Sequence, residues 1–505
     1  MTLLIIAGSE SNGFAGCVRD LAVAHSLGAD AQLVLTCVTA QTGTGVLACE
    51  SLSPDLLRAQ LSSLRVTPAV IKIGLLTQHA QAETIAHWLS TLTNSPFVIL
   101  DPIRNSSGDD QPFAQESFVE ILSPLFPWVS LITPNLLELR ALTDAPSDQP
   151  EHDCATKFFQ QFPKFSGDIL LTGGHADNLA HSATVIDRLY RRCDQVKTVK
   201  ASQVAQWQQT KHAQSLRGTG CRLSTTIACA VEQNYAVLDA ITLANASLQR
   251  RLQLPVDESS TEPLGWPKDI RDFANVSSDK IIKTPKHPFA RMRKTKGIYP
   301  VVDSSAWITR LAMTGIKTIQ LRLKNCPTKL LRDEIAEAIY VARHYDLQLF
   351  INDHWQLAIE LGAYGVHLGQ EDLTDADLTA IQQAGLRFGV STHGDFELCS
   401  ALQLRPSYIA VGAVFPTRTK DMSGKIQGLK RLRRYCELSP EIPVVAIGGI
   451  DEKNIESVLA QGVNIVAVVS AITQADNPER QCRGLESTVT DRVKSRLPLQ
   501  RNIGT

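Results

Sequence analysis

Residues 348–353 read Gln-Leu-Phe-Ile-Asn-Asp, a short apolar run that ends in two polar side chains. The same pattern recurs at 365–369, Gly-Val-His-Leu-Gly, with Gln-Glu-Asp directly beyond it. Apolar runs of this length that are bounded by polar or turn residues are typical of buried β-strands. Working outward from these two, the second half of the chain holds eight such runs, at 298–303, 318–324, 348–353, 365–369, 387–392, 408–414, 443–449 and 465–471.

Stretches with helical patterning separate most of these runs, for example 329–345 and 454–461. Strands that alternate with helices predict right-handed βαβ units and a parallel sheet. Eight such units that close on themselves make a (β/α)8 barrel, and an open doubly wound sheet is the alternative. In a barrel the site lies where the strands end, so the polar strand ends predict one shared mouth.

The side chains predicted at that mouth suit an anionic substrate. Asp353 and Asp372 offer hard oxygen ligands for Mg2+, and three cations stand at the same edge, Arg322, Lys324 and Lys420. Glycines after the seventh run allow a phosphate to approach backbone N–H groups. We therefore expect a substrate that carries a diphosphate as its leaving group, and a metal ion that assists the release of that group. The alternative is that these residues form structural ion pairs.

The motifs of this half resemble thiamine-phosphate synthases in the right order over about 297–475, a highly specific match: QLRLK at 320–324, FIND at 350–353, GVHLGQEDL at 365–373, GVSTH at 389–393, FPTRTK at 415–420, AIGGI at 446–450 and AVVSAI at 467–472. The resemblance implies that hydroxymethylpyrimidine diphosphate is joined to hydroxyethylthiazole phosphate with release of diphosphate. It implies a pyrimidine diphosphate site of Gln320, Arg322, Lys324, Asn352, Ser391 and Lys420, with Arg322 and Lys420 catalytic. It further implies Mg2+ on Asp353 and Asp372, and a thiazole phosphate site of Thr417, Thr419, Gly449, Val469 and Ser470.

The first half opens with a buried run at 3–7 and a loop of small residues at 8–16. Further apolar runs at 31–38, 69–74, 97–101, 131–133 and 168–172 alternate with helical patterns, which predicts a doubly wound α/β sheet. Its strongest local signal is Gly218-Thr219-Gly220-Cys221, which precedes a helical run. Free N–H groups there favour an anion, and the first helical turn favours a thiolate at Cys221. A glycine turn followed by a buried cysteine is the alternative.

Motifs of this half resemble the hydroxymethylpyrimidine/phosphomethylpyrimidine kinases of the ribokinase-like fold over about 1–250: AGSESNGFAG at 7–16, TAQTGTGV at 39–46, IKIGLL at 71–76, LDPIRNSSGD at 100–109, TPNLLEL at 133–139, TGGH at 172–175 and GTGC at 218–221. The resemblance implies phosphorylation of hydroxymethylpyrimidine and its monophosphate, with ATP as co-substrate and Mg2+. It implies that Gln41 binds the pyrimidine, that Cys221 is the catalytic base and that Gly218, Thr219 and Gly220 form the anion hole. Asp101, Asn135 and Glu138 would lie by the phosphates and the metal.

This half departs from the family pattern at several positions: Asn12, Phe14, Ala22, Arg104, Thr172 and Arg217. Two of them, Ala22 and Thr172, replace lysines. Two readings therefore stay open for this half. In one it is an active kinase that feeds the synthase. In the other it is a degenerate domain that senses a ligand or serves a structural role beside an active synthase.

Composition and patterning set the remaining expectations. We predict a kinase-like domain at 1–254, a linker at 255–296, a barrel at 297–480 and a C-terminal tail at 481–505. With 50 basic and 51 acidic residues, the chain lacks the basic excess of a nucleic-acid binder. Scattered cysteines and the lack of a membrane-spanning run predict a cytoplasmic enzyme that acts on small molecules, away from membranes. The oligomeric state stays open, a homo-oligomer included.

Overall fold

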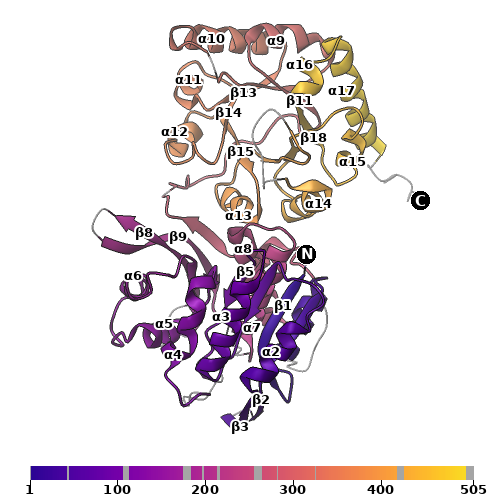
Figure 1. Ribbon diagram of the computed structural model, residues 1–505. Coiled ribbons are helices and arrows are strands. Elements are labelled where there is room, and N and C mark those ends of the chain that lie inside the picture. Colours follow the sequence, from indigo (N-terminus) through magenta and orange to yellow (C-terminus); the bar gives the residue numbers. More distant parts are fainter. Residues whose placement is uncertain are drawn as a thin grey trace, which may run out of the picture. The chain divides into compact units, whose positions relative to one another are not determined.

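The computed structural model describes residues 2–42, 45–105, 113–174, 183–195, 198–212, 216–254, 264–280, 282–324, 326–417 and 426–495. The chain divides into two compact units (Figure 1), one made of 1–267 and 271–279 and the other of 268–270 and 280–505. The division falls inside the segment predicted as a linker, 255–296. Among the described residues, no helix is both long and apolar enough to cross a membrane.

The first unit is built on a ten-stranded sheet in the order β10-β9-β8-β7-β6-β5-β4-β1-β2-β3. Its six parallel strands are those that the sequence predicts: β1 (Leu3–Glu10), β2 (Ala31–Thr42), β4 (Val70–Ile73), β5 (Phe97–Leu100), β6 (Leu131–Ile132) and β7 (Asp168–Leu171). In β1, β4, β5, β6 and β7 the β-branched and leucine side chains are buried on both faces of the sheet, whereas β2 is partly exposed, as at Val38. The doubly wound, ribokinase-like prediction is confirmed for this core.

Antiparallel strands extend the sheet at both edges, and the sequence did not reveal them. They are β3 (Gly45–Ser51), β8 (Thr184–Gln195), β9 (Thr198–Thr210) and β10 (Asn275–Ser278). These strands are polar on one face, so they lack the continuous apolar runs of the parallel core. β10 lies in the predicted linker, as does a short 3-10 helix at Ile270–Asp272, so part of that segment belongs to the first unit.

Helices cover the sheet in two groups of mutually packed neighbours. One group is α1 (Gly16–Ser26), α7 (Thr219–Glu232) and α8 (Val237–Gln253). The other group is α2 (Pro54–Ser62), α3 (His79–Thr91), α4 (Phe118–Leu122), the 3-10 helix Ser123–Trp128, α5 (Leu136–Thr143) and α6 (Glu151–Gln161). The largest apolar core of the unit lies between this second group and the parallel strands. Every parallel strand thereby ends at an edge that the helices leave open.

The second unit is a closed barrel of eight parallel strands, as predicted. The strands are β11 (Gly297–Val302), β12 (Thr318–Leu321), β13 (Gln348–Asn352), β14 (Gly365–Leu368), β15 (Arg387–Thr392), β16 (Tyr408–Val411), β17 (Val444–Ala446) and β18 (Ile465–Val468). The helices between them are α9 (Ser305–Leu311), the 3-10 helix Ala312–Thr314, α10 (Thr328–His344), α11 (Trp355–Glu360), α12 (Leu378–Gln383), α13 (Asp395–Gln403), α14 (Gly428–Leu438), α15 (Ile455–Leu459) and α16 (Ser470–Thr473).

Three aromatic rings fill the inside of the barrel: Tyr299, Phe350 and Tyr408. Their centroids lie 5.0–5.9 Å apart in edge-on and tilted pairs. Two strand glycines make room for them. A Cβ at Gly389 would lie 2.1 Å from the Tyr408 ring, and one at Gly365 would lie 2.5 Å from the Phe350 ring. The barrel is therefore a packed core below its mouth.

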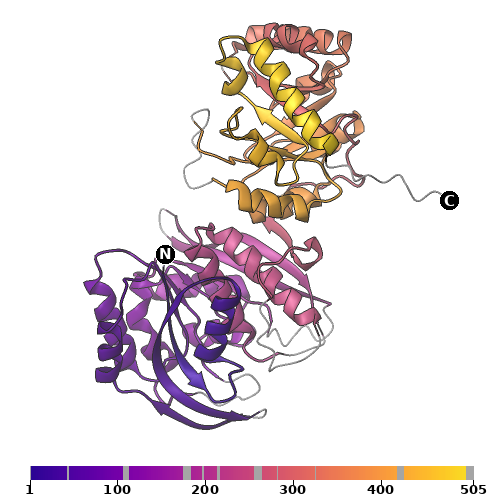
Figure 2. The same cartoon turned by 90° about the vertical axis from the view of Figure 1, so that its right-hand side faces the viewer.

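Residues 481–495 of the predicted C-terminal tail belong to a helix that packs on the outside of the barrel. This helix, α17 (Pro478–Ser495, yellow in Figures 1 and 2), packs against β11, α9 and α15. Its apolar positions Cys482, Leu485 and Val489 are buried. Glu486 Oε2 accepts a hydrogen bond from the Ile298 N–H at 2.7 Å. The boundary predicted at residue 480 therefore cuts through an element of the barrel unit.

We expect Leu485→Ala to lower the free energy of unfolding of the barrel unit by about 2–5 kcal/mol, because it removes buried apolar volume between α17 and the barrel. Arg483→Ala, on the exposed face of the same helix, is the matched control and should change it by less than about 0.5 kcal/mol. Denaturant unfolding of the full chain measures both, and equal small effects would show that α17 does not support the barrel.

Two candidate active sites

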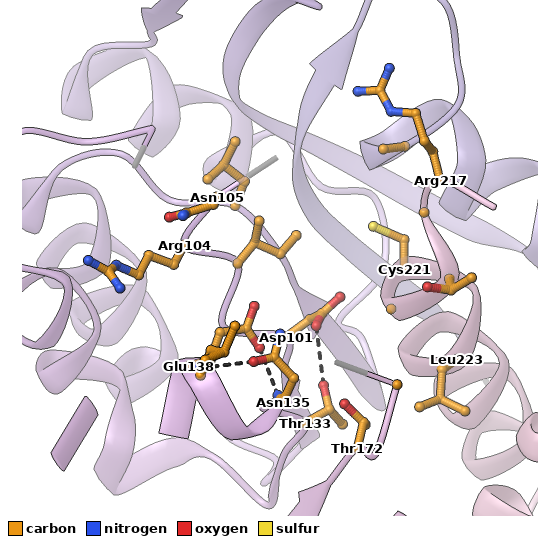
Figure 3. Close-up of a pocket in the computed structure, with 18 of the residues that line it drawn as sticks. Asp101, Arg104, Asn105, Thr133, Asn135, Glu138, Thr172, Arg217, Cys221 and Leu223 are labelled. Atoms are coloured by element: carbon orange, nitrogen blue, oxygen red, sulfur yellow. Dashed lines mark hydrogen bonds between the residues drawn. The ribbon is translucent and has the colours of Figure 1, made fainter. Parts of the chain in front are cut away.

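A cavity of about 1340 Å3 opens at the carboxyl edge of the parallel strands in the first unit. All eight residues that the sequence predicts for this half line it: Gln41, Asp101, Asn135, Glu138, Gly218, Thr219, Gly220 and Cys221. Figure 3 shows Cys221 on one wall and Asp101, Asn135 and Glu138 across from it. Arg104, Thr172 and Arg217 line the cavity too. The structure thus brings the predicted groups together in one place.

The GTGC motif forms the N-terminal end of α7, whose 14 residues give it a full set of aligned peptide dipoles. Gly218 adopts a left-handed conformation (φ +72°), and a Cβ there would lie 2.4 Å from the Phe14 carbonyl oxygen. Only glycine suits both conditions. The first N–H groups of α7 have no partner within the helix, so they can hold an anion at the cavity wall.

Burial of the Cys221 side chain opposes the thiolate that the first turn of the helix is expected to favour. Burial raises the pKa of Cys221 to about 12, and nearby Asp20 and Asp101 add to the rise. Lys72 opposes this shift without overcoming it. Desolvation is the largest cause of this rise, so the cavity wall disfavours the charged form of the thiol.

A buried lysine at the base of the cavity was missed as a functional candidate. Lys72 Nζ lies 2.7 Å from Asp20 Oδ2 and 4.0 Å from Asp101 Oδ2, and its side chain is fully buried. Burial disfavours its charge, but the carboxylates of Asp20 and Asp101 outweigh that cost and raise its pKa. Thr225 Oγ1 donates to Asp20 Oδ1 at 2.8 Å. A lysine inside the apolar run Ile71-Lys-Ile73 was the signal in the sequence.

Two carboxyl groups stand opposite α7. Asp101 accepts hydrogen bonds from Ser224 Oγ at 3.0 Å and Thr133 Oγ1 at 3.4 Å, and burial raises its pKa. Glu138 forms a reciprocal capping box with Asn135 at the start of α5. Burial raises the pKa of Glu138 to about 8, and Asp101 contributes to the rise. Both carboxyl groups would gain from a cation in the cavity.

Gln41 is held by two residues at which the chain departs from the family pattern. Arg217 donates to Gln41 Oε1 at 2.5 Å and to the Thr42 carbonyl at 2.9 Å. Asn12 Nδ2 donates to the Gln41 carbonyl at 3.0 Å. Gln41 Nε2 donates to Thr39 Oγ1 at 2.9 Å. The substitutions at Asn12 and Arg217 thus meet at one strand end and fix the orientation of Gln41.

At the barrel mouth the two predicted metal ligands lie side by side. Burial and the adjacent Asp353 raise the pKa of Asp372, and Gly369 N–H donates to Asp372 Oδ2 at 3.2 Å. Lys324 Nζ lies 3.1 Å from Asp353 Oδ2. Asp353 adopts a left-handed backbone conformation (φ +64°), an uncommon one for a residue other than glycine. Among the described residues no third His, Cys, Asp or Glu joins them as a metal group.

The donor set at this mouth suits Mg2+, because two hard carboxylates repel each other until a cation lies between them. The other predicted residues occupy strand ends at the same edge: Gln320, Arg322, Asn352, Ser391, Thr417, Gly449, Val469 and Ser470. Gly449 packs against the Phe415–Pro416 backbone directly before Thr417. Thr419 and Lys420 lie outside the described residues.

A buried chain of hydrogen bonds below the mouth was not predicted as part of the site. His367 Nδ1 is 2.8 Å from Tyr408 Oη and His367 Nε2 is 2.9 Å from Ser391 Oγ. Tyr408 Oη is 2.9 Å from Tyr299 Oη, to which Gln320 Nε2 donates at 3.3 Å. Burial lowers the pKa of His367 to about 4, so its imidazole is neutral near pH 7. These bonds orient Gln320 and Ser391 toward fixed partners.

We expect Glu138→Gln to stabilise the first unit in a pH-dependent way. The Gln variant keeps an oxygen that can accept the Asn135 N–H, but it has no charge to bury. The ordinary pKa is 4.5 and the folded pKa is about 8, so wild-type stability falls between these pH values while the variant lacks that loss. Urea unfolding from pH 4 to 9 should show the gap widen over this window and then level; a constant gap would contradict the assignment.

Comparison with known proteins assigns each unit to a family. The family model described as phosphomethylpyrimidine kinase matches residues 10–262, about half of the chain. The family model described as thiamine monophosphate synthase matches residues 298–472.

Individual relatives agree with the second assignment. The chain is 56% identical over 191 residues to a thiamine-phosphate synthase of Photorhabdus laumondii, covering 38% of this chain and 88% of the relative. It is 56% identical over 188 residues to that of Serratia proteamaculans, covering 37% and 89%. A solved phosphomethylpyrimidine kinase from Clostridium difficile aligns with 22% identity and a TM-score of 0.39, covering 50% of this chain and all of that one. The chain therefore belongs to the phosphomethylpyrimidine kinases through its first half and to the thiamine-phosphate synthases through its second, two families of transferases.

Proposed function

We propose that one chain carries out two consecutive steps toward thiamine phosphate. The kinase half, residues 1–254, uses ATP to phosphorylate hydroxymethylpyrimidine and then its monophosphate. The barrel unit, α17 included, couples the resulting diphosphate to hydroxyethylthiazole phosphate and releases diphosphate. The proposal rests on one observation. In each unit the strand ends bring together a side chain that could take part in the reaction and groups that could bind phosphate. In the first unit these are Cys221 and the N–H groups of Gly218–Cys221.

In the kinase half we assign Cys221 as the base that takes the proton from the substrate hydroxyl. Burial is the main cause of its raised pKa and the charges of Asp20 and Asp101 add to it, so a cation beside these carboxylates would lower the pKa toward that of a base. Asp101 and Glu138 offer the oxygen donors that Mg2+ with ATP phosphates prefers, and the ion would supply positive charge there. Lys72 remains charged below them and favours the thiolate. The N–H groups of α7 stabilise the transferred phosphoryl group.

In the barrel we assign the residues to two binding regions, one for each phosphate-bearing substrate. We assign Arg322, Lys324 and Lys420 to the pyrimidine diphosphate, where they stabilise the charge that grows as diphosphate departs. Gln320, Asn352 and Ser391 hold the pyrimidine. Asp353 and Asp372 would hold Mg2+, which supplies further positive charge at the leaving group. The thiazole phosphate is assigned to a separate set: Thr417, Thr419, Gly449, Val469 and Ser470.

We expect Cys221→Ala to reduce pyrimidine phosphorylation by about 100-fold or more, because a general base contributes at least that factor. Cys229→Ala is the matched control, since Cys229 is buried in the same helix but does not line the cavity. Both variants should form thiamine phosphate normally when pyrimidine diphosphate is supplied. Product analysis with ATP and each pyrimidine substrate tests this. Unchanged ATP consumption in Cys221→Ala would instead favour a degenerate first half.

We expect Asp353→Asn and Asp372→Asn each to slow thiamine phosphate formation by about 100-fold and to raise the Mg2+ concentration needed for half-maximal rate. Neither should lower stability near pH 7, because each removes one of two repelling carboxylates. Asp375→Asn, an exposed carboxylate in the same loop, is the control and should behave like wild type. A full rate in either of the first two variants, at unchanged Mg2+ dependence, would exclude the metal assignment.

A further inference from the structure

The side-chain amide of Gln41 has a direction that decides which ligands it can bind. Gln41 lies near the end of β2, lines the kinase cavity and is almost fully buried. An amide carries an acceptor oxygen and a donor nitrogen, and a half turn of the group exchanges the two. The neighbours of Gln41 fix which of these two atoms lies on which side.

The oxygen end of the amide is fixed by Arg217. Arg217 Nη2 donates to Gln41 Oε1 at 2.5 Å, and Arg217 Nη1 donates to the Thr42 carbonyl oxygen at 2.9 Å. A guanidinium group only donates hydrogen bonds, so the amide atom that faces it must be the oxygen. The second bond ties the guanidinium group to the backbone and holds it beside Gln41.

The nitrogen end of the amide is fixed by Thr39. Gln41 Nε2 donates to Thr39 Oγ1 at 2.9 Å, and Thr39 Oγ1 donates to the Ser9 carbonyl oxygen at 3.2 Å. A hydroxyl has one hydrogen and a carbonyl oxygen only accepts, so Thr39 gives its hydrogen to Ser9 and accepts from Gln41. The run of bonds from Arg217 to Ser9 starts at a group that only donates and ends at one that only accepts. It therefore has a single direction.

A half turn of the Gln41 amide would break this run at two places. The amide nitrogen would face the guanidinium group of Arg217, donor against donor, and the amide oxygen would face Thr39. The loss of one hydrogen bond to a charged group corresponds to a factor of about 10–100 in an equilibrium constant. Gln41 therefore presents one orientation to a ligand in the cavity.

This amide is tied to the wall that carries the candidate base. Arg217 directly precedes the GTGC motif, and Figure 3 shows Arg217 and Cys221 on the same side of the cavity. A ring that pairs with Gln41 thus lies on the side where its hydroxyl group must meet Cys221.

Hydroxymethylpyrimidine has an amino group next to a ring nitrogen, which is a donor beside an acceptor. The Gln41 amide offers the complementary pair. In an analogue with oxygen in place of the amino group the order is reversed, because the oxygen accepts and the ring nitrogen carries a hydrogen. That oxo analogue pairs with Gln41 only if the amide turns, which Arg217 opposes, or if the ring turns over, which moves the hydroxymethyl group away from Cys221.

We propose that Arg217 is a positioning residue that determines specificity: it holds the Gln41 amide in the orientation that binds an aminopyrimidine and rejects an oxopyrimidine. The inference rests on the proposed function of the first unit as a pyrimidine kinase. It gives the departure from the family pattern at Arg217 a role in the choice of substrate.

The test is titration calorimetry of the full chain with hydroxymethylpyrimidine and with its oxo analogue. Wild type should bind the amino compound about 100-fold more tightly. Arg217→Gln should reduce this ratio about tenfold, in part through tighter binding of the oxo analogue, because a glutamine can accept as well as donate. Arg217→Lys, which still only donates, should keep the ratio within about threefold of wild type. Arg65→Gln, an exposed arginine of the same unit, is the control and should match wild type.

The ratio of the two affinities distinguishes a specificity role from a structural one. If Arg217→Gln weakens both compounds equally and leaves the ratio unchanged, the proposal is overturned. Equal binding of both compounds by wild type would also overturn it, and that measurement needs no variant to fold.

Phosphorylation of both compounds, measured in parallel as kcat/KM, separates this inference from the function on which it rests. If wild type prefers the amino compound, Arg217→Gln loses that preference and neither protein phosphorylates it, the role of Arg217 stands and the kinase activity is refuted. If wild type phosphorylates both compounds with equal kcat/KM, the kinase activity stands and the role of Arg217 is refuted.

Discussion

Parallel strands present all their carboxyl ends at one edge, and this constraint places the chemistry of both units. In the first unit the edge collects Asp101 after β5, Asn135 after β6 and the loop that leads into α7. In the second it collects the side chains that follow eight strands of a closed ring. The two units differ in topology, but each uses the same geometric fact to bring distant parts of the sequence together.

In the first unit, buried charged groups determine the pKa values of the side chains that line the kinase cavity. Lys72 forms buried ion pairs with Asp20 and Asp101. Removal of any one of the three would leave a buried charge without its partner, which lowers stability strongly. The same group controls Cys221, since the aspartates raise its pKa and the lysine lowers it. A cation that binds beside these carboxylates would therefore lower the pKa of the thiol, while burial remains the largest cause of its rise.

The sequence predicts the parallel strands of both units because buried strands are marked by continuous apolar runs. It does not reveal β8, β9 and β10, whose one-sided polarity resembles that of loops, or the role of α17, whose apolar positions are few. Motifs identified all eight kinase-half residues that line the cavity. They could not give the protonation of Cys221, because desolvation depends on every neighbour that the fold supplies. The bonds of Arg217 and Asn12 to the Gln41 strand end were equally invisible, since they join residues far apart in the chain.

The aromatic core of the barrel affects how ligands reach the mouth as well as how the interior is packed. The rings of Tyr299, Phe350 and Tyr408 fill the interior below the mouth. Two of these rings pack directly against the backbone at Gly365 and Gly389. In the part of the barrel that the structure describes, these rings leave no path through the interior. Ligands of this mouth therefore enter and leave on the side where the strands end, and the packed interior serves as a rigid base beneath them.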